Sequence, residues 1–248
     1  MMTSTDTTTT QKIDIKRAAQ DILATVERER EREIVARRFG LFDRKETLEQ
    51  IGELLGITRE RVRQLEKSVI ARLRANASAG DVPHIDELQA QMLDLLHHVG
   101  QVARVNDLAK KITGQDGRLE QARTAFIAEL APKLLVVSEN DHYYHSVAAT
   151  QAHDEKQLKA AVTNIIEAVK KIGKPTTIEK IAEKVGESDV KHVKALANTS
   201  KHLATLNGRW GLIKWPMVNP KNIRDKIYVV LHENGKHMHF SEIAEAIK

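Results

Sequence analysis

A seven-residue pattern occurs four times along this chain and sets the strongest limit on its fold. In each copy two variable residues precede an apolar and a small residue, and two more precede a second apolar residue. The copies are Glu49–Leu55, Asn106–Ile112, Glu179–Val185 and Ser241–Ile247. Apolar residues at this spacing lie on one face of a helix. We expect the small residue to let the following helix cross closely, which predicts tandem helix-turn-helix units.

The first copy lies in a predicted helix-turn-helix. Thr47 and Gln50 have the spacing of a capping box, and Gly56 follows the last apolar residue of the copy. Thr58 is placed to cap the next helix, expected over Thr58–Arg74. The inward stripe of that helix comprises Val62, Leu65, Val69, Ile70 and Leu73.

A longer helical stretch is expected upstream, from Ile13 to Phe39, with Gly40 as its C-terminal cap. Its middle part, Glu27–Glu33, alternates glutamate and arginine. We interpret most of these residues as a solvated face with ion pairs three and four residues apart. Downstream, Ala75–Pro83 has the composition of a linker.

The second and third copies each lie within a trio of predicted helices. Helices over Ile85–Val99 and Gly117–Leu130 flank the second copy, and helices over Leu158–Ile172 and Ser188–Leu203 flank the third. The strands expected after the two trios are Leu134–Val137 with His142–Val147, then Ala204–Leu206 with Arg209–Ile213. Asn207-Gly208 is the turn sequence of a tight hairpin. Three helices followed by a hairpin is the order of a winged helix.

The sequence therefore predicts a mainly α fold of tandem helix-turn-helix and winged-helix domains with small β-hairpin wings. Aromatic residues make up only 4% of the chain, so any cores are small and aliphatic. The fourth copy follows a helix over Asn222–Asn234, but no third helix comes after it. The predicted parts are a disordered leader at residues 1–12, a helix-turn-helix domain at 13–76, winged helices at 84–150 and 154–218, and the start of a truncated third winged helix at 221–248.

The charge of the chain suits a polyanionic partner. The net charge is +5 and the isoelectric point is near 9.3, a weak signal by itself. From Arg59 to Arg74, however, six basic residues accompany only two acidic ones. The chain has no cysteine, which excludes disulfides and thiolate metal sites and suits a reducing cytoplasm. No apolar run approaches the roughly 18–20 residues that a membrane span needs.

The start of the helix expected over Thr58–Arg74 carries side chains suited to reading bases in double-stranded DNA. They are Arg59, Glu60, Arg63 and Gln64. Their spacing puts them on one outward face, opposite the apolar stripe. Arginine can bind guanine bidentately, glutamate can accept from cytosine, and glutamine can pair with adenine. An alternative is that Glu60 pairs with Arg63 or Gln64 and reads nothing.

Two segments, Arg30–Leu41 and Thr47–Glu66, resemble the C-terminal domain of bacterial primary sigma factors. Thr58–Glu66, with the sequence Thr-Arg-Glu-Arg-Val-Arg-Gln-Leu-Glu, is the most specific part. The resemblance implies that the four outward residues read the minus-35 promoter hexamer, with Arg63 at a base or a phosphate. The positions that it assigns to the DNA backbone are Arg30, Arg38 and Thr47. Such contacts fix register and make binding salt-dependent.

Further backbone contacts are expected from Thr58, Arg61, Lys67 and, at the tip of the second hairpin, Arg209. An alternative is that Arg61 and Lys67 are solvated surface residues. Trp210 and Trp215 fit core packing, or else a wing that touches DNA or a protein.

The resemblance also implies RNA polymerase core as a partner, because the same domain of sigma factors grips the beta subunit through an apolar groove. Val35, Phe39 and Leu55 are candidates for that groove or for the core. The segment upstream of Glu29 is too short to hold polymerase or melt a minus-10 element, so a stand-alone sigma factor is not expected. The later units resemble the winged helix of the polymerase delta subunit, on Phe240–Ile247 and the order of elements.

Two functions are therefore open. The first is a sequence-specific DNA-binding transcription factor that acts at promoters in the bacterial cytoplasm, at the nucleoid. The second is a polymerase-associated accessory factor that uses the sigma-like domain for protein docking. We expect no enzyme activity and no cofactor, because the sequence has no phosphate loop, nucleophile elbow or paired-carboxylate pattern. We also expect no metal site, because the histidines lack a suitable spacing.

Overall fold

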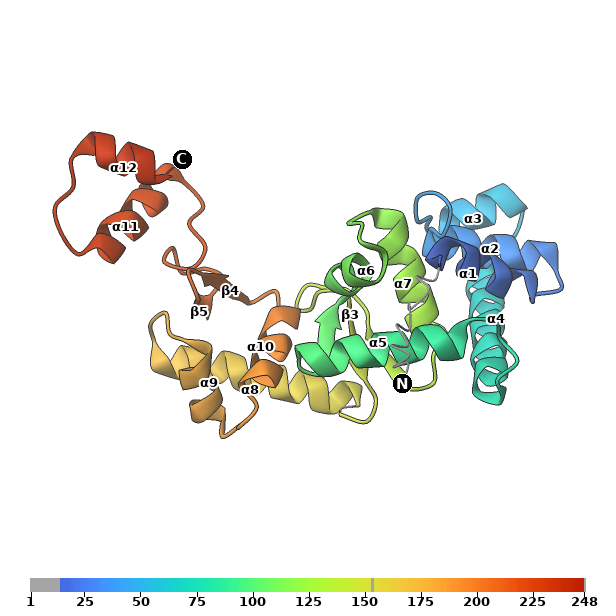
Figure 1. The fold of residues 1–248 in the computed structure, drawn as a ribbon. Helices are drawn as coiled ribbons and strands as arrows, with labels where there is room; N and C mark the ends of the chain where they lie inside the picture. The colour runs from blue at the N-terminus through green and yellow to red at the C-terminus, as the bar shows by residue number, and fades with distance from the viewer. Residues whose placement is uncertain (1–13, 153, 248) are drawn as a thin grey trace, which may run out of the picture. The chain divides into compact units, whose positions relative to one another are not determined.

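The structure, a computed structural model, describes residues 14–152 and 154–247. This part of the chain is mainly helical, with 12 helices and small antiparallel sheets, which confirms the predicted class (Figure 1). None of these helices combines the length and the apolar character that crossing a membrane requires. The leader predicted at residues 1–12 lies outside the described residues.

The helices are α1 (Ile15–Ala24), α2 (Glu29–Phe39), α3 (Leu48–Leu55), α4 (Arg59–Ala79), α5 (Ile85–Val99), α6 (Val105–Thr113), α7 (Arg118–Leu130), α8 (Glu155–Ile172), α9 (Ile178–Val185), α10 (Val190–Thr199), α11 (Ile223–Asn234) and α12 (Phe240–Ile247). The strands are β1 (Val102–Arg104), β2 (Leu134–Val137), β3 (Ser146–Ala149), β4 (Leu203–Leu206) and β5 (Arg209–Leu212).

The chain divides into two compact units. The first comprises the chain up to Leu95 together with Val105–Leu134, and the second comprises Leu96–Arg104 together with the chain from Leu135 onward. The first unit therefore contains α1 to α4, α6 and α7, and the second contains β1, β3 and the elements from α8 to α12. The domain boundaries expected from the sequence stay a prediction.

The first unit begins with two helices where the sequence predicts one. Asp14 caps α1, and its carboxylate accepts from the backbone nitrogens of Lys16 (2.8 Å) and Arg17 (3.3 Å). The helix ends at Thr25, whose hydroxyl donates to the carbonyl oxygen of Ile22 at 2.7 Å. The prediction of a continuous helix is wrong at this point, because a threonine hydroxyl competes with the helix for a backbone carbonyl.

Helices α3 and α4 form the predicted helix-turn-helix. Thr47 and Gln50 make both hydrogen bonds of the capping box, at 3.2 and 2.9 Å. A Cβ on Gly52 would lie 2.7 Å from the Ile57 carbonyl oxygen. The turn therefore passes over this glycine together with the start of the following helix, because the backbone nitrogen of Arg59, the first residue of α4, would lie 3.5 Å from the same Cβ. Helix α4 continues to Ala79, so the first half of the predicted linker is helical.

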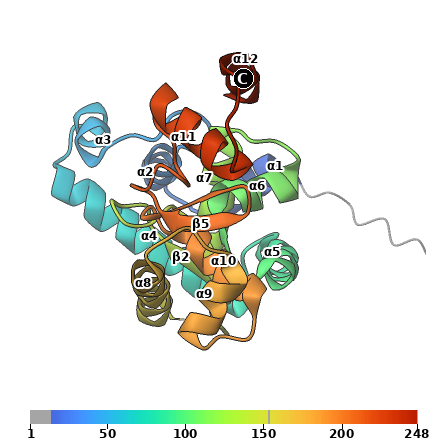
Figure 2. The same ribbon diagram turned by 90° about the vertical axis from the view of Figure 1, so that its left-hand side faces the viewer.

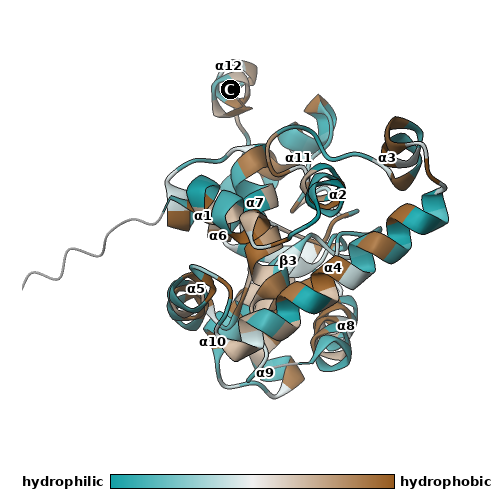
Figure 3. Ribbon diagram, turned by 90° about the vertical axis from the view of Figure 1, so that its right-hand side faces the viewer, coloured by the Kyte–Doolittle hydropathy of each residue, from teal (hydrophilic) through white to brown (hydrophobic). Residues whose placement is uncertain are grey.

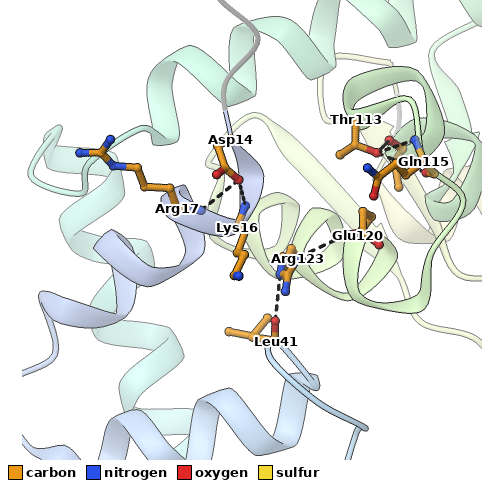
Figure 4. Close-up of polar contacts among 9 residues, drawn as sticks. Asp14, Lys16, Arg17, Leu41, Thr113, Gln115, Glu120 and Arg123 are labelled. Atoms are coloured by element: carbon orange, nitrogen blue, oxygen red, sulfur yellow. Dashed lines mark hydrogen bonds and ion pairs between the residues drawn. The ribbon is translucent and has the colours of Figure 1, made fainter.

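Helix α7 completes the core of the first unit by packing against α1, α2 and α4. Phe126 is fully buried and meets Phe39 of α2 edge to face, with ring centroids 5.1 Å apart. Arg123 is also buried, and its Nε donates to the Leu41 carbonyl oxygen at 2.9 Å (Figure 4). Its guanidinium is balanced by Glu120, one turn earlier in α7, at 3.2 Å. The helix-turn-helix thus shares a core with a segment far along the sequence.

In the second unit, α8, α9 and α10 surround one core, and β4 and β5 lie beside α8 and α10 (Figure 2). The two strands pair antiparallel, with Leu203 opposite Leu212 and Leu206 opposite Arg209. Asn207 and Gly208 between them have φ angles of 49° and 74°. Two consecutive positive φ angles are what a type I′ turn requires, so the hairpin predicted at this place is confirmed.

Of the remaining strands, β2 lies where the sequence predicts it, over Leu134–Val137, whereas β1 and β3 differ from the prediction. β1, which the sequence analysis missed, pairs antiparallel with β3, with Val102 opposite Ala148. β3 itself begins at Ser146, later than the strand predicted over His142–Val147. The cause is the side chain of Asn140, which accepts from the backbone nitrogens two and three residues on, at 2.8 and 2.9 Å, and turns the chain there.

Candidate nucleic-acid interface

The candidate reading helix, α4, begins directly after the turn that follows α3. Thr58 has extended backbone and caps the helix, and its hydroxyl accepts from the Arg61 backbone nitrogen at 3.2 Å. The predicted base-reading residues Arg59, Glu60, Arg63 and Gln64 are all exposed. Val62, Val69 and Leu73 are buried, and hydrophilic and hydrophobic residues alternate along α4 in Figure 3. The outward face exists, and its role in reading bases stays a prediction.

Glu60 lies at the centre of a hydrogen-bond network on this face. Its carboxylate accepts from Nε and Nη2 of Arg63, at 2.8 and 2.7 Å, and from the side-chain amide of Gln64 at 3.3 Å. The hydrogen bonds from Arg63 are the main cause that lowers the pKa of Glu60 to about 2. Glu60 therefore stays ionised over the physiological pH range, and it pairs with both residues named in the alternative interpretation.

Arg59 joins the start of α4 to the first turn of α3. Its Nη1 lies 3.0 Å from Oε1 of Glu49, and both side chains are more than half exposed. An ion pair so open to water contributes little to stability. Arg59 can therefore exchange Glu49 for another acceptor at small cost.

Two of the predicted backbone-contacting arginines already bind groups inside the unit. Arg30 donates through Nη2 to the carbonyl of Leu55, the last residue of α3. Arg38 is partly buried, and its Nε lies 3.3 Å from the Glu66 carboxylate of α4. Both arginines thus hold α2 against the helix-turn-helix, a role that sequence reasoning did not assign to them.

The other predicted backbone contacts are more open. Thr47 and Thr58 stand at the N-termini of α3 and α4, where free backbone N–H groups and the helix dipole favour an anion. Arg61 and Lys67 are exposed on α4. Arg209 is exposed at the start of β5, in the second unit.

Sequence reasoning missed a buried carboxylate that fixes α2 against α4. Glu31 is only 6% exposed, and it accepts from Nη2 of Arg72 at 2.6 Å and from Nη1 of Arg28 at 3.3 Å. The hydrogen bond from Arg72 is the largest cause that lowers the pKa of Glu31. The available signal was its spacing, because Ile34 and Val35 follow it by three and four residues on the inward face.

The third helices of the later trios are packed within their units. Seven residues of α7, from Arg123 to Leu130, are buried. Helix α10 packs against β1 on one side and against α8 and α9 on another. The His192 ring nitrogen Nδ1 lies 2.7 Å from the carbonyl oxygen of Gly100, and Gly100 is itself pressed against the backbone of Lys191. Among these three helices, α4 therefore has the most open face for a DNA groove.

The residues predicted for a polymerase-binding groove lie mostly inside the first unit. Val35 is fully buried. Phe39 is partly buried and stacked edge to face on Phe126 of α7, and Leu55 is partly buried beside the core formed by Ile34, Ile51 and Val62. In the second unit Trp210 is buried in the core, as its packing interpretation expects.

Comparison with known proteins assigns part of the chain. Residues 28–75 match the family Sigma-70, region 4, and form a domain similar to that of primary sigma factors. The chain is 44% identical over 61 residues to RNA polymerase sigma factor SigA of Bacillus sp. The matched segment makes up 24% of this chain and 16% of the relative. It is 45% identical over 64 residues to RNA polymerase sigma factor RpoD of Helicobacter pylori. That matched segment makes up 25% of this chain and 9% of the relative. The chain thus spans less than a fifth of these relatives' length, and the rest of it has no family assigned. No solved structure is significantly similar to it.

Proposed function

We propose that this protein is a sequence-specific DNA-binding transcription factor that acts at promoters and reads a minus-35-like element with α4. The observation that carries the proposal is the exposed, capped start of α4 inside a Sigma-70 region 4 domain. Its proposed partners are double-stranded promoter DNA and RNA polymerase core, in the bacterial cytoplasm. No catalytic role and no cofactor are part of the proposal.

In the proposed mechanism the first turns of α4 enter the major groove. Arg59 exchanges Glu49 for a guanine, and Gln64 pairs with an adenine. A carboxylate offers about four acceptor positions, of which Glu60 uses three for Arg63 and Gln64. One position is left for a cytosine amino group. Glu60 can therefore read a base while it holds Arg63 in place.

The backbone contacts in this mechanism are of two kinds. The N-termini of α3 and α4, capped by Thr47 and Thr58, each offer N–H groups to a phosphate. Arg61 and Lys67 would neutralise phosphates beside the groove, which makes binding salt-dependent. Arg30 and Arg38 keep N–H donors beyond those used inside the unit, and in the proposed mechanism these donors bind phosphates of the DNA backbone.

In vitro selection of bound DNA from a random pool tests the proposal. The full chain should enrich one motif, and Arg59→Ala combined with Gln64→Ala should relax the motif at the bases that these residues read. Losing one bidentate contact costs roughly 1–3 kcal/mol of discrimination at one base pair. The matched control is Arg17→Ala with Gln20→Ala, the same residue types on the exposed face of α1. If no motif is enriched, or if the reading variant keeps the motif, the proposal fails.

The competing function, a polymerase-associated factor that docks through its sigma-like domain, is less well supported. Docking at Phe39 would have to displace α7, because Phe126 covers that ring. This function predicts that purified polymerase core retains the full chain at low salt without promoter DNA. Because the main proposal also includes polymerase as a partner, retention favours docking over base reading only if the random DNA pool yields no enriched motif.

A further inference from the structure

A pocket of about 450 Å³ lies within the second unit, outside the sigma-like domain. Its volume falls in the range of pockets that hold small molecules. One wall is a single face of α8, because its members lie three, four and seven residues apart: Thr163, Ile166, Glu167 and Lys170. The last residue of β5 and the two residues that follow it, up to Lys214, form a second wall.

Two segments far apart in the sequence form the third wall of the pocket. Tyr143 and Ser200 make an antiparallel bridge, and the backbone nitrogen that follows Ser200 donates to the His142 carbonyl oxygen at 2.8 Å. The backbone nitrogen of Ile213 in turn donates to the carbonyl oxygen of His202 at 2.9 Å. Backbone hydrogen bonds therefore join the second and third walls, as a largely pre-formed site requires.

The lining of the pocket suits a flat apolar group. It is mostly apolar, with aliphatic side chains from α8 and from the end of β5. The third wall adds the rings of His142, Tyr143 and His202. The two imidazole rings have centroids 5.0 Å apart and planes inclined by 33°. Aromatic ligands stack on rings of this kind in offset or edge-to-face geometry.

The histidine pair leaves one hydrogen-bond donor for a ligand. Nδ1 of His142 lies 2.8 Å from Nε2 of His202, so one of these nitrogens donates its proton to the other. A neutral imidazole carries a single N–H, so the ring that accepts holds its own proton on its outer nitrogen. Whichever ring accepts, that outer N–H is left to donate. The described residues supply no further histidine, cysteine or carboxylate that would complete a metal site with this pair.

The charged side chains of the lining favour an anion. Lys170 and Lys214 contribute two positive charges, and Glu167 contributes one negative charge. The Glu167 carboxylate is already engaged, because its Oε1 accepts from Nζ of Lys170 at 2.8 Å. Lys214 therefore supplies one positive charge that the lining does not balance. A carboxylate carries one negative charge and matches it better than a phosphate monoester, which carries nearly two.

We propose that this pocket binds a small aromatic carboxylate. Its ring lies against Tyr143 and the histidine rings, and its carboxylate pairs with Lys214 and accepts from the outer N–H of the histidine pair. The second unit is then a small-molecule-binding module. The proposal does not depend on DNA binding by α4.

A ligand-observed NMR titration of the full chain with 2-naphthoate tests the proposal. We expect a dissociation constant of about 0.1–1 mM, because each non-hydrogen atom of a small ligand contributes only a limited free energy. 2-Naphthamide has the same ring without the charge and should bind at least about 10-fold more weakly, since hydrogen bonds to charged groups are the stronger ones. Absence of 2-naphthoate binding at about 10 mM, or equal binding of the amide, overturns the proposal.

Substitutions locate the site. Thr163→Phe fills the pocket from α8 and should weaken 2-naphthoate binding by at least about 10-fold. The matched control is Asn164→Phe, which puts the same ring on the next exposed residue of α8, outside the lining, and should leave binding unchanged. Equal effects of these two changes would contradict the assignment of the pocket.

A second pair of variants tests the charge. Lys214→Gln should weaken 2-naphthoate binding by about 10-fold and leave the weaker binding of 2-naphthamide as it is. Lys174→Gln removes an exposed lysine that lies outside the lining and should alter neither ligand. An unaltered 2-naphthoate affinity in Lys214→Gln, or the same loss in both variants, would contradict recognition of the carboxylate by Lys214.

Discussion

Replacing Phe126 with alanine would remove a fully buried aromatic ring that lies outside the sigma-like segment but inside its core. The ring is 0% exposed and meets Phe39 at 5.1 Å, although the family match ends at residue 75. A buried Phe→Ala change costs about 3–5 kcal/mol, from lost burial and the cavity that remains. The aromatic pair adds about 0.5–1.5 kcal/mol of coupling, which a double-mutant cycle with Phe39→Leu should recover. The free energy of unfolding of the first unit should therefore fall by about 3–5 kcal/mol when Phe126 alone is replaced.

Urea unfolding followed by two probes separates the units. Both tryptophans, Trp210 and Trp215, lie in the second unit, so their fluorescence reports that unit, whereas circular dichroism reports helices of both. Phe126→Ala should create an early transition in circular dichroism and leave the fluorescence transition in place. A loss below about 1 kcal/mol, or an equal shift of both transitions, would refute the view that α7 completes the core around the helix-turn-helix.

Three further changes test other parts of the first unit. Arg72 holds the pKa of Glu31 below its usual 4.5, so this ion pair stabilises the fold above that pH and its contribution is lost as the pH falls through the lowered pKa. Glu31→Gln should therefore flatten the acid side of a plot of melting temperature against pH, and an unchanged plot would contradict the ion pair. Glu60→Gln removes a negative charge and the bidentate partner of Arg63. Fluorescence anisotropy should show tighter binding to random DNA and weaker discrimination at one base pair, by about 1–3 kcal/mol, and unaltered discrimination would exclude Glu60 from reading. Gly52→Val should destabilise the helix-turn-helix by about 1–3 kcal/mol in calorimetry, because its Cβ would meet the turn backbone, and a neutral result would mean that the turn can move aside.

The helix-turn-helix was predictable because its signals are local. The capping box at Thr47 and the cap at Thr58 each act over three residues, and Gly56 ends α3 where the sequence predicts. The exposed face of α4 was predictable as well, because the helical spacing of its apolar residues leaves the charged residues on the opposite side. The hairpin at Asn207-Gly208 was predictable for the same reason, because the turn type is set by two residues.

What sequence reasoning missed depends on partners far along the chain. Glu31 looks like part of a solvated charged run until Arg72, 41 residues later, is seen to bind it. The roles of Arg30 and Arg38 likewise depend on Leu55 and Glu66. The strand β1 has only three residues, too few for a recognisable alternation, and it forms because β3 pairs with it.

The contact between Arg123 and Leu41 joins residues that are far apart in the sequence and are therefore synthesised at different times. The family segment ends at residue 75, yet α7 ends at Leu130, about 55 residues later. At a synthesis rate of about 5–20 residues per second, the synthesis of α7 is completed roughly 3–11 seconds after that of the helix-turn-helix segment. During that interval Phe39 lacks Phe126, its aromatic partner in the folded unit. Ribosome-bound chains stalled before and after α7 should therefore differ in how strongly they resist a protease.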